Sequence, residues 1–160
     1  MILSIAVLVA AALLLGGHGL PPRSVSFSQS TKDVKAYDFV EITAQVSAPH
    51  APNPFTDAVI RGRFERVADG KRWQVEGFSD AEDGSVYRIR FMPPAPGDYT
   101  YSVEYRQGWS STTSTGTFQA SDGRLRGPIR IDPKNRWHFI WEGTGEHYFF
   151  NGTTAYWLIG

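Results

Sequence analysis

Hydrophobic and polar residues alternate along several short segments in the middle of the chain. The clearest is 40–46 (VEITAQV), where apolar side chains occupy every second position. A period of two places these side chains on one face of a β-strand, which can then be buried against a second sheet. Comparable or shorter runs occur at 25–27, 58–65, 73–75, 87–91, 99–105 and 117–119. The pattern predicts about seven strands, and no segment of this region has a sustained helical period.

Turn signals separate these strands. Ala68-Asp69-Gly70 is typical of a turn, and Pro93–Gly97 (PPAPG) interrupts regular pairing because proline lacks the N–H donor of a ladder. Short strands with a turn roughly every 8–12 residues are typical of a sandwich. We therefore predict an all-β fold, an immunoglobulin-like antiparallel β-sandwich over 24–127. Tyr99 directly follows the proline-rich turn, and it is either a tyrosine corner bonded to nearby backbone or a residue that merely packs.

The chain opens with an apolar segment, Ile2–Leu15, in which Ser4 is the only polar residue. A membrane-spanning helix needs about 20 apolar residues, so this length fits the h-region of a secretory signal better. Gly17 and Gly19 supply small residues for cleavage. We predict that 1–19 is a signal peptide and that the protein is secreted or periplasmic. No Lys or Arg precedes the apolar run, which leaves an uncleaved anchor as the alternative.

The net charge and the cysteine content limit the partners and the chemistry that the sequence supports. Sixteen Lys and Arg residues balance 16 Asp and Glu residues, so no global field attracts nucleic acid or an anionic membrane. The chain has no Cys, which excludes disulfides, thiol catalysis and Cys-ligated zinc. We expect no cofactor, no nucleic-acid partner and no membrane contact beyond the signal segment.

Two clusters in the predicted sandwich have both a chemical and a structural interpretation. Asp80, Glu82 and Asp83 could bind calcium through carboxylate oxygens, but their spacing is not that of an EF-hand and an acidic hairpin turn is the simpler interpretation. A basic cluster alternates with apolar residues, which favours a solvated sheet face over nucleic-acid binding. Its members are Arg61, Arg63, Arg66, Lys71 and Arg72.

Three histidines and one tryptophan are further candidate functional residues. His50, His138 and His147 do not have the i, i+4 or short-loop spacing of metal ligands, so no metal site is predicted. Trp109 lies in a predicted loop, where a large apolar residue is less expected. It is therefore a candidate for carbohydrate contact, and the alternative is that it folds back to cap the core.

The sequence changes character after Ala120. A linker, Arg124–Pro128, leads to a predicted hairpin whose arms are Trp137–Trp141 and His147–Phe150, and Asn151–Gly160 follows as an apolar, aromatic segment. Such a strand is normally paired on both sides or covered. We expect 128–160 to contain a linker, a hairpin and the truncated first strand of a second, barrel domain.

Several short motifs, taken in order, resemble domain of unknown function 5060. They are Asn53–Asp57 (NPFTD), Gly77-Phe78, Tyr87–Pro93 (YRIRFMP), Gly97–Tyr101 (GDYTY), and Gly127-Pro128 before Trp137–Phe139 (WHF). The resemblance covers roughly Ser24–Gly160. It implies an N-terminal immunoglobulin-like sandwich of bacterial secreted glycoside hydrolases. The implied neighbour is an apiosidase-like (β/α)8 barrel, also described as collagen-binding, and Gly152–Trp157 (GTTAYW) resembles its first strand.

The resemblance implies a function divided between two domains. Glycosidases use two carboxyl groups about 5–9.5 Å apart, which a barrel supplies from several strands, and this chain contains at most one such strand. No catalytic residue is therefore assigned. We predict a non-catalytic module of an exported carbohydrate-active enzyme. It would brace the barrel by intramolecular packing, could help to shape the substrate cleft and contribute to glycan binding, and would meet polysaccharide or glycoside through the parent enzyme.

Two questions remain open at this level. Tyr156 and Trp157 either contact sugar or pack inside the barrel. The alternative function is a free-standing carbohydrate-binding or adhesive module, with Trp109 as a contact. A small enzyme complete in itself is disfavoured because no constellation of residues supports it.

Overall fold

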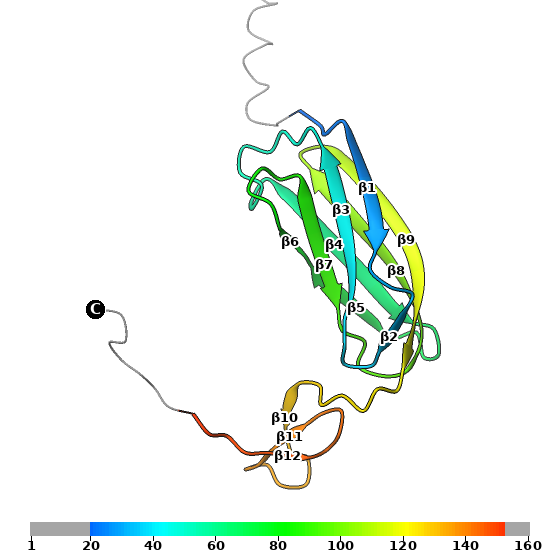
Figure 1. The fold of residues 1–160 in the computed structure, drawn as a ribbon, viewed down its shortest axis with the longest axis vertical. Helices are drawn as coiled ribbons and strands as arrows, with labels where there is room; N and C mark the ends of the chain where they lie inside the picture. The colour runs from blue at the N-terminus through cyan, green and yellow to red at the C-terminus, as the bar shows by residue number, and fades with distance from the viewer. Residues whose placement is uncertain (1–19, 153–160) are drawn as a thin grey trace, which may run out of the picture.

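The computed structural model describes residues 20–152, which form twelve strands and no helix. The first nine strands build a sandwich of two sheets, which confirms the predicted all-β architecture (Figure 1). The four-stranded sheet has the order β1 (Ser24–Gln29), β3 (Val40–Ser47), β7 (Val86–Phe91), β6 (Phe78–Ser79). The five-stranded sheet has the order β2 (Asp33–Lys35), β9 (Ser110–Ser121), β8 (Gly97–Gln107), β4 (Ala58–Arg66), β5 (Arg72–Glu76).

The core lies between the two sheets and is rich in aromatic rings. Phe64 of β4 stacks on Phe91 of β7 with 4.3 Å between ring centroids, and Tyr99 of β8 stacks on Phe118 of β9 at 5.0 Å. Residues two apart on each strand are buried together, as the alternation of the sequence predicts. An aromatic core of this kind holds the sandwich without any disulfide.

Tyr99 has both of the roles considered from the sequence. Its side chain is fully buried, and its hydroxyl donates a hydrogen bond to the Ala95 carbonyl at 2.8 Å. This is the bond of a tyrosine corner, which fixes the proline-rich turn onto the start of β8. Burial raises the pKa of the Tyr99 phenol, so the hydroxyl stays protonated and available as a donor.

The edges of the sandwich contain more strand than the sequence pattern predicts. β9 begins at Ser110, directly after a two-residue turn. The sequence pattern predicts a strand only at 117–119 and a loop over the Ser/Thr-rich residues 110–116. Residues 110–118 of β9 pair with β8 alone, their outward side chains need not be apolar, and threonine suits a pleated surface. β2 and β6 are three and two residues long, too short to give a periodic signal.

A third, small sheet follows the sandwich and is called the C-terminal sheet here. Its order is β10 (Ile129–Ile131), β11 (Phe139–Trp141), β12 (His147–Tyr148), so the predicted hairpin is present and gains a third strand. It lies beyond one end of the sandwich, opposite the end at which the described chain begins (Figure 1). The predicted signal peptide and first barrel strand lie outside the described residues, apart from Gly152.

Tyr37 forms the joint between the sandwich and the C-terminal sheet. Its backbone has a φ of 67°, and its N–H donates to the Pro93 carbonyl at 2.9 Å. Its ring lies against the backbone of Gly127 and Gly143, where an added Cβ would come within 2.6 and 2.8 Å of ring carbons. Glycine at both positions allows the ring to fit between the linker and the turn of the hairpin.

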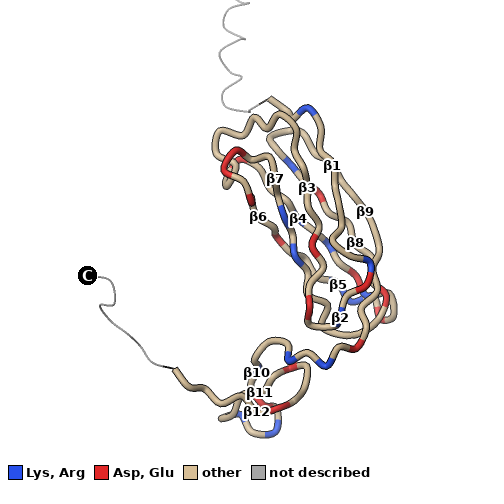
Figure 2. Tube along the Cα trace, in the orientation of Figure 1, with Lys and Arg blue, Asp and Glu red and all other residues tan. Residues whose placement is uncertain are grey.

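Charged side chains of both signs are distributed over the strands and loops, in keeping with the zero net charge (Figure 2). Residues 20–152 contain no candidate for a membrane-spanning helix.

Candidate functional site

Trp109 lies at the tip of the long hairpin formed by β8 and β9. Gln107 pairs with Ser110, so Gly108 and Trp109 form a two-residue turn, and Gly108 has a φ of 56° that favours glycine. The Trp109 side chain is 72% exposed. It therefore does not cap the core, and an aromatic face remains available at this end of the sandwich.

Hydrogen bonds of two buried side chains hold the turn that carries Trp109 in place. The Tyr105 hydroxyl donates to Gln107 Oε1 at 2.9 Å, and Gln107 Nε2 donates to the Leu20 carbonyl at 3.1 Å. Burial raises the pKa of the Tyr105 phenol, which keeps its proton in this chain of bonds. An exposed ring on a fixed turn loses little conformational entropy on binding a ligand.

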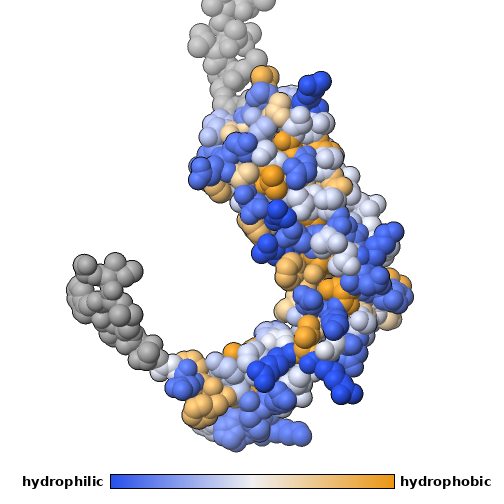
Figure 3. All heavy atoms as spheres, in the orientation of Figure 1, coloured by the Kyte–Doolittle hydropathy of each residue, from blue (hydrophilic) through white to orange (hydrophobic). Residues whose placement is uncertain are grey.

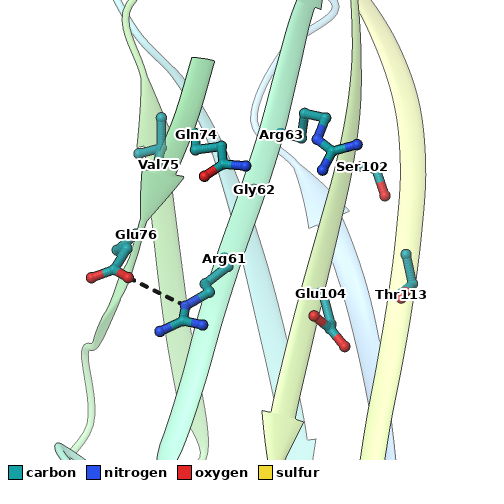
Figure 4. A pocket seen from close by; sticks show the side chains of 9 residues that line it. All are labelled: Arg61, Gly62, Arg63, Gln74, Val75, Glu76, Ser102, Glu104 and Thr113. Carbon is teal, nitrogen blue, oxygen red and sulfur yellow. Dashed lines mark ion pairs between the residues drawn. The ribbon is translucent and has the colours of Figure 1, made fainter. Parts of the chain in front are cut away.

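A shallow polar groove lies on the outer face of the five-stranded sheet (Figure 4). Its volume is about 780 Å³, and it is lined by Arg61, Gly62, Arg63, Gln74, Val75, Glu76, Ser102, Glu104 and Thr113. Hydrogen-bonding side chains from four strands meet there, but no aromatic ring lines the groove. Such a surface can form hydrogen bonds to a glycan but lacks the flat apolar platform on which a sugar ring stacks.

Two of the groove's four charged side chains pair with each other. Arg61 Nε lies 3.2 Å from Glu76 Oε1, and the Ser111 hydroxyl donates to a Glu104 carboxylate oxygen at 2.5 Å. Both carboxylates of the groove are thus engaged by neighbouring side chains.

The basic cluster behaves as the predicted solvated sheet face. Besides Arg61, Arg72 pairs with Glu65 at 2.6 Å, and Arg66 pairs with Asp69. The Arg66 hydrogen bond lowers the pKa of the Asp69 carboxyl to about 2. Three of the five basic side chains, Arg61, Arg66 and Arg72, are thus paired with local acids.

The acidic loop before β7 uses its carboxylates locally. Asp80 accepts a hydrogen bond from Arg88 Nε at 2.6 Å, and Asp83 accepts one from the Ser85 N–H at 2.9 Å. The bonds from Ser85 lower the pKa of the Asp83 carboxyl. These contacts are those of a hairpin turn, the simpler of the two interpretations of Asp80, Glu82 and Asp83.

The segments that flank the strands of the C-terminal sheet carry exposed aromatic side chains. Trp137, Phe149 and Phe150 are 91%, 84% and 73% exposed. Figure 3 shows hydrophobic side chains at the surface of this sheet and at the bend that joins it to the sandwich. Tyr156 and Trp157, the other two candidates for sugar contact, lie outside the described residues.

The same sheet brings together three side chains that are far apart in the sequence or lack the usual spacing of metal ligands. Asp132, His138 and His147 each offer a ligand atom, and these atoms all lie within 4.8 Å of one another. Among the described residues, this is the group that could hold a metal ion. Metal-ligand spacing rules missed it because the three residues come from different strands or strand ends.

A protein-family model matches most of the sandwich. Residues 33–106 match the model of DUF5060, a domain of unknown function. This span begins at β2 and ends within β8, so it covers most of the sandwich. No curated protein matches the chain.

Among solved structures, a putative glycoside hydrolase from Bacteroides vulgatus is similar to this chain. It is 31% identical, with a TM-score of 0.60, over 79% of this chain and 23% of that one. The chain therefore spans about a quarter of that relative's length. More distant likenesses include the Lin-41 filamin domain, 17% identical with a TM-score of 0.44 over 66% of this chain and 99% of that one. The PKD domain of human SorCS2 is 16% identical, with a TM-score of 0.40 over 68% and 81%.

Proposed function

We propose that this chain is a non-catalytic β-sandwich module of an exported glycoside hydrolase, which braces a catalytic barrel. The observation that carries the proposal is the 31% identity over 79% of the chain to 23% of a putative glycoside hydrolase. The sandwich corresponds there to one part of a larger protein, which leaves most of that protein for a catalytic domain.

The carboxyl groups support a non-catalytic role. Glu41, Asp69 and Asp83 have pKa values shifted downward, whereas the acid of a glycosidase needs a raised pKa. The groove carboxylates Glu76 and Glu104 are held by Arg61 and Ser111.

The C-terminal sheet is the proposed contact with the barrel. Its exposed rings, Trp137, Phe149 and Phe150, form a surface that a neighbouring domain would cover. The Trp109 turn lies at the opposite end of the sandwich, roughly 33 Å away at the rise of β8. Trp109 is therefore too far from this surface to shape a cleft between the sandwich and the barrel.

Two measurements test the proposal. The purified chain, incubated with aryl glycosides and polysaccharides, is expected to release no product, and turnover that is lost on substitution of Glu76 or Glu104 by Gln would overturn the non-catalytic assignment. The gene, read past the codon for Gly160, is expected to continue in frame into alternating strand and helix patterns. A stop codon at that point would overturn the bracing role.

The exposure of Trp109 favours carbohydrate binding as a second candidate function. Affinity electrophoresis on a panel of polysaccharides should then show retardation of the chain that Trp109→Ala removes. The matched control is Trp137→Ala, which removes a ring that is even more exposed, at the other end of the protein. Equal retardation of the wild type and Trp109→Ala on every polysaccharide would exclude this function.

A further inference from the structure

The geometry points to a zinc site on the C-terminal sheet, with Asp132, His138 and His147 as its ligands. The pairing of the strands places these three residues on one face. β10 and β11 pair antiparallel with Ile131 opposite Phe139, and continuing this register by one residue sets Asp132 opposite His138. The Asp132 N–H donates to the His138 carbonyl at 2.9 Å, which confirms the pairing.

The third ligand comes from the neighbouring strand. His147 of β12 is paired with Ile140 of β11, and Ile140 lies two residues after His138. Side chains two apart on a strand share a face, so His147 lies diagonally across from His138 on the face that also carries Asp132. The two imidazole rings meet edge to face with 5.5 Å between their centroids.

The local contacts keep two of the ligands in place. Asp132 is buried, with 8% of its surface exposed, and its Oδ1 accepts a hydrogen bond from the Lys134 N–H at 2.8 Å. The second carboxylate oxygen remains available to a metal. The His138 N–H donates to the Asn135 carbonyl at 2.9 Å, and the Asn135 side-chain nitrogen lies 3.3 Å from His138 Nδ1.

The donor set and spacing suit zinc. Two imidazoles and a carboxylate are ligands that Zn²⁺ binds at about 2.0–2.2 Å, and a water molecule commonly takes the fourth position. Tetrahedral ligands at that distance lie about 3.3 Å apart, so atoms within 4.8 Å of one another need only small side-chain rotations to close on the ion. A buried carboxylate next to two imidazoles also gains a compensating charge when a divalent cation binds.

Zinc would join the three strands of a sheet that has little core of its own. Each ligand lies on or next to a different strand, so one ion would link β10, β11 and β12. This role does not depend on the proposed function, because it concerns the order of the sheet and not the binding of a glycan or a barrel.

The test is zinc titration of the chain, prepared without a histidine tag and stripped with EDTA. Calorimetry with ZnCl₂ is expected to show one site per chain. Co²⁺ is expected to give visible absorption bands in the same stoichiometry. His147→Gln, His138→Gln and Asp132→Asn should each weaken binding by more than about tenfold, since loss of even a supporting contact costs that much. His50→Gln, an exposed histidine of the sandwich region, should leave binding unchanged.

Hydrogen exchange provides a readout that does not depend on the variants. Zinc is expected to slow exchange of the Asp132 and His138 amides while leaving the sandwich amides unchanged. Absence of one-to-one binding at millimolar zinc would overturn the site. Binding that survives the three ligand substitutions, or that is lost equally in His50→Gln, would also overturn it.

Discussion

The sandwich and the C-terminal sheet place their aromatic residues in opposite ways. In the sandwich, Phe64, Phe91 and Tyr99 are buried between two sheets. Beside the strands of the C-terminal sheet, Trp137 and Phe150 are exposed, and Trp141 within it is only half-buried. A small sheet needs another layer to bury its apolar face, whereas two facing sheets bury each other's. The sandwich is therefore complete in itself, while the C-terminal sheet depends on something that covers it or ties it together.

Truncation of aromatic rings should show this contrast most strongly. Phe91→Ala is expected to lower the free energy of unfolding by about 3–5 kcal/mol because it leaves a cavity between the sheets. Trp137→Ala should change it by less than about 0.5 kcal/mol, since its side chain is already 91% exposed. Urea denaturation followed by circular dichroism measures both. Similar losses in the two variants would contradict the contrast.

Removal of a tyrosine hydroxyl should lower the stability more in the sandwich than in the C-terminal sheet, with smaller losses than ring truncation gives. Tyr99→Phe leaves the Ala95 carbonyl without its donor and should cost about 1–2 kcal/mol in the same denaturation experiment. Tyr148→Phe is the matched control in the C-terminal sheet. Its ring packs edge-on against Trp141 at 5.1 Å, and that packing is kept, so little change is expected. A loss in Tyr148→Phe as large as that in Tyr99→Phe would show that the small sheet is as tightly specified as the sandwich.

Acid sensitivity should give the smallest effect and should arise in the sandwich. Burial opposes ionisation of Glu41, but hydrogen bonds from Arg90 and Arg88 outweigh it and lower the pKa of the Glu41 carboxyl below its ordinary value of 4.5. The folded state then binds fewer protons than the unfolded chain. The stabilisation that Glu41 contributes is complete above about pH 4.5 and is lost as the pH falls below that value.

Substitution of Glu41 isolates this contribution. Glu41→Gln should cost about 1 kcal/mol at pH 7 and should flatten the decline in stability below about pH 4.5. Glu142→Gln removes a comparable pair, because Glu142 lies 2.9 Å from Arg130 in the C-terminal sheet. The control should keep the acid dependence of the wild type. An unchanged acid profile in Glu41→Gln would show that other carboxylates account for it.

Much of the sandwich could be predicted from its alternating segments. A strand such as β3 has one buried face, and its period of two is visible in the sequence alone. β6 and β2 could not be found because two or three residues carry no period. The length of β9 was underestimated because its outward face is polar, so the Ser/Thr run before Thr117 resembles a loop.

The candidate sites were predictable to different degrees. Trp109 could be selected because an apolar residue in a polar loop stands out in the sequence. The cluster of Asp132, His138 and His147 depends on strand register, which spacing rules for helices and short loops do not represent. The predicted hairpin turn offered one signal, since a turn at Glu142–Glu146 makes β11 and β12 neighbours and brings the two histidine-bearing segments together.

The parallel pairing of β2 with β9 has a mechanical consequence. Asp33 pairs with Gln119, and Lys35 pairs with Ser121, at the end of the sandwich where the chain leaves for the linker. Tension between the start of β1 and the linker pulls β2 and β9 in opposite directions along their common axis. The hydrogen bonds between them are then loaded together in shear instead of opening one by one. A domain of this design resists stretching along its length.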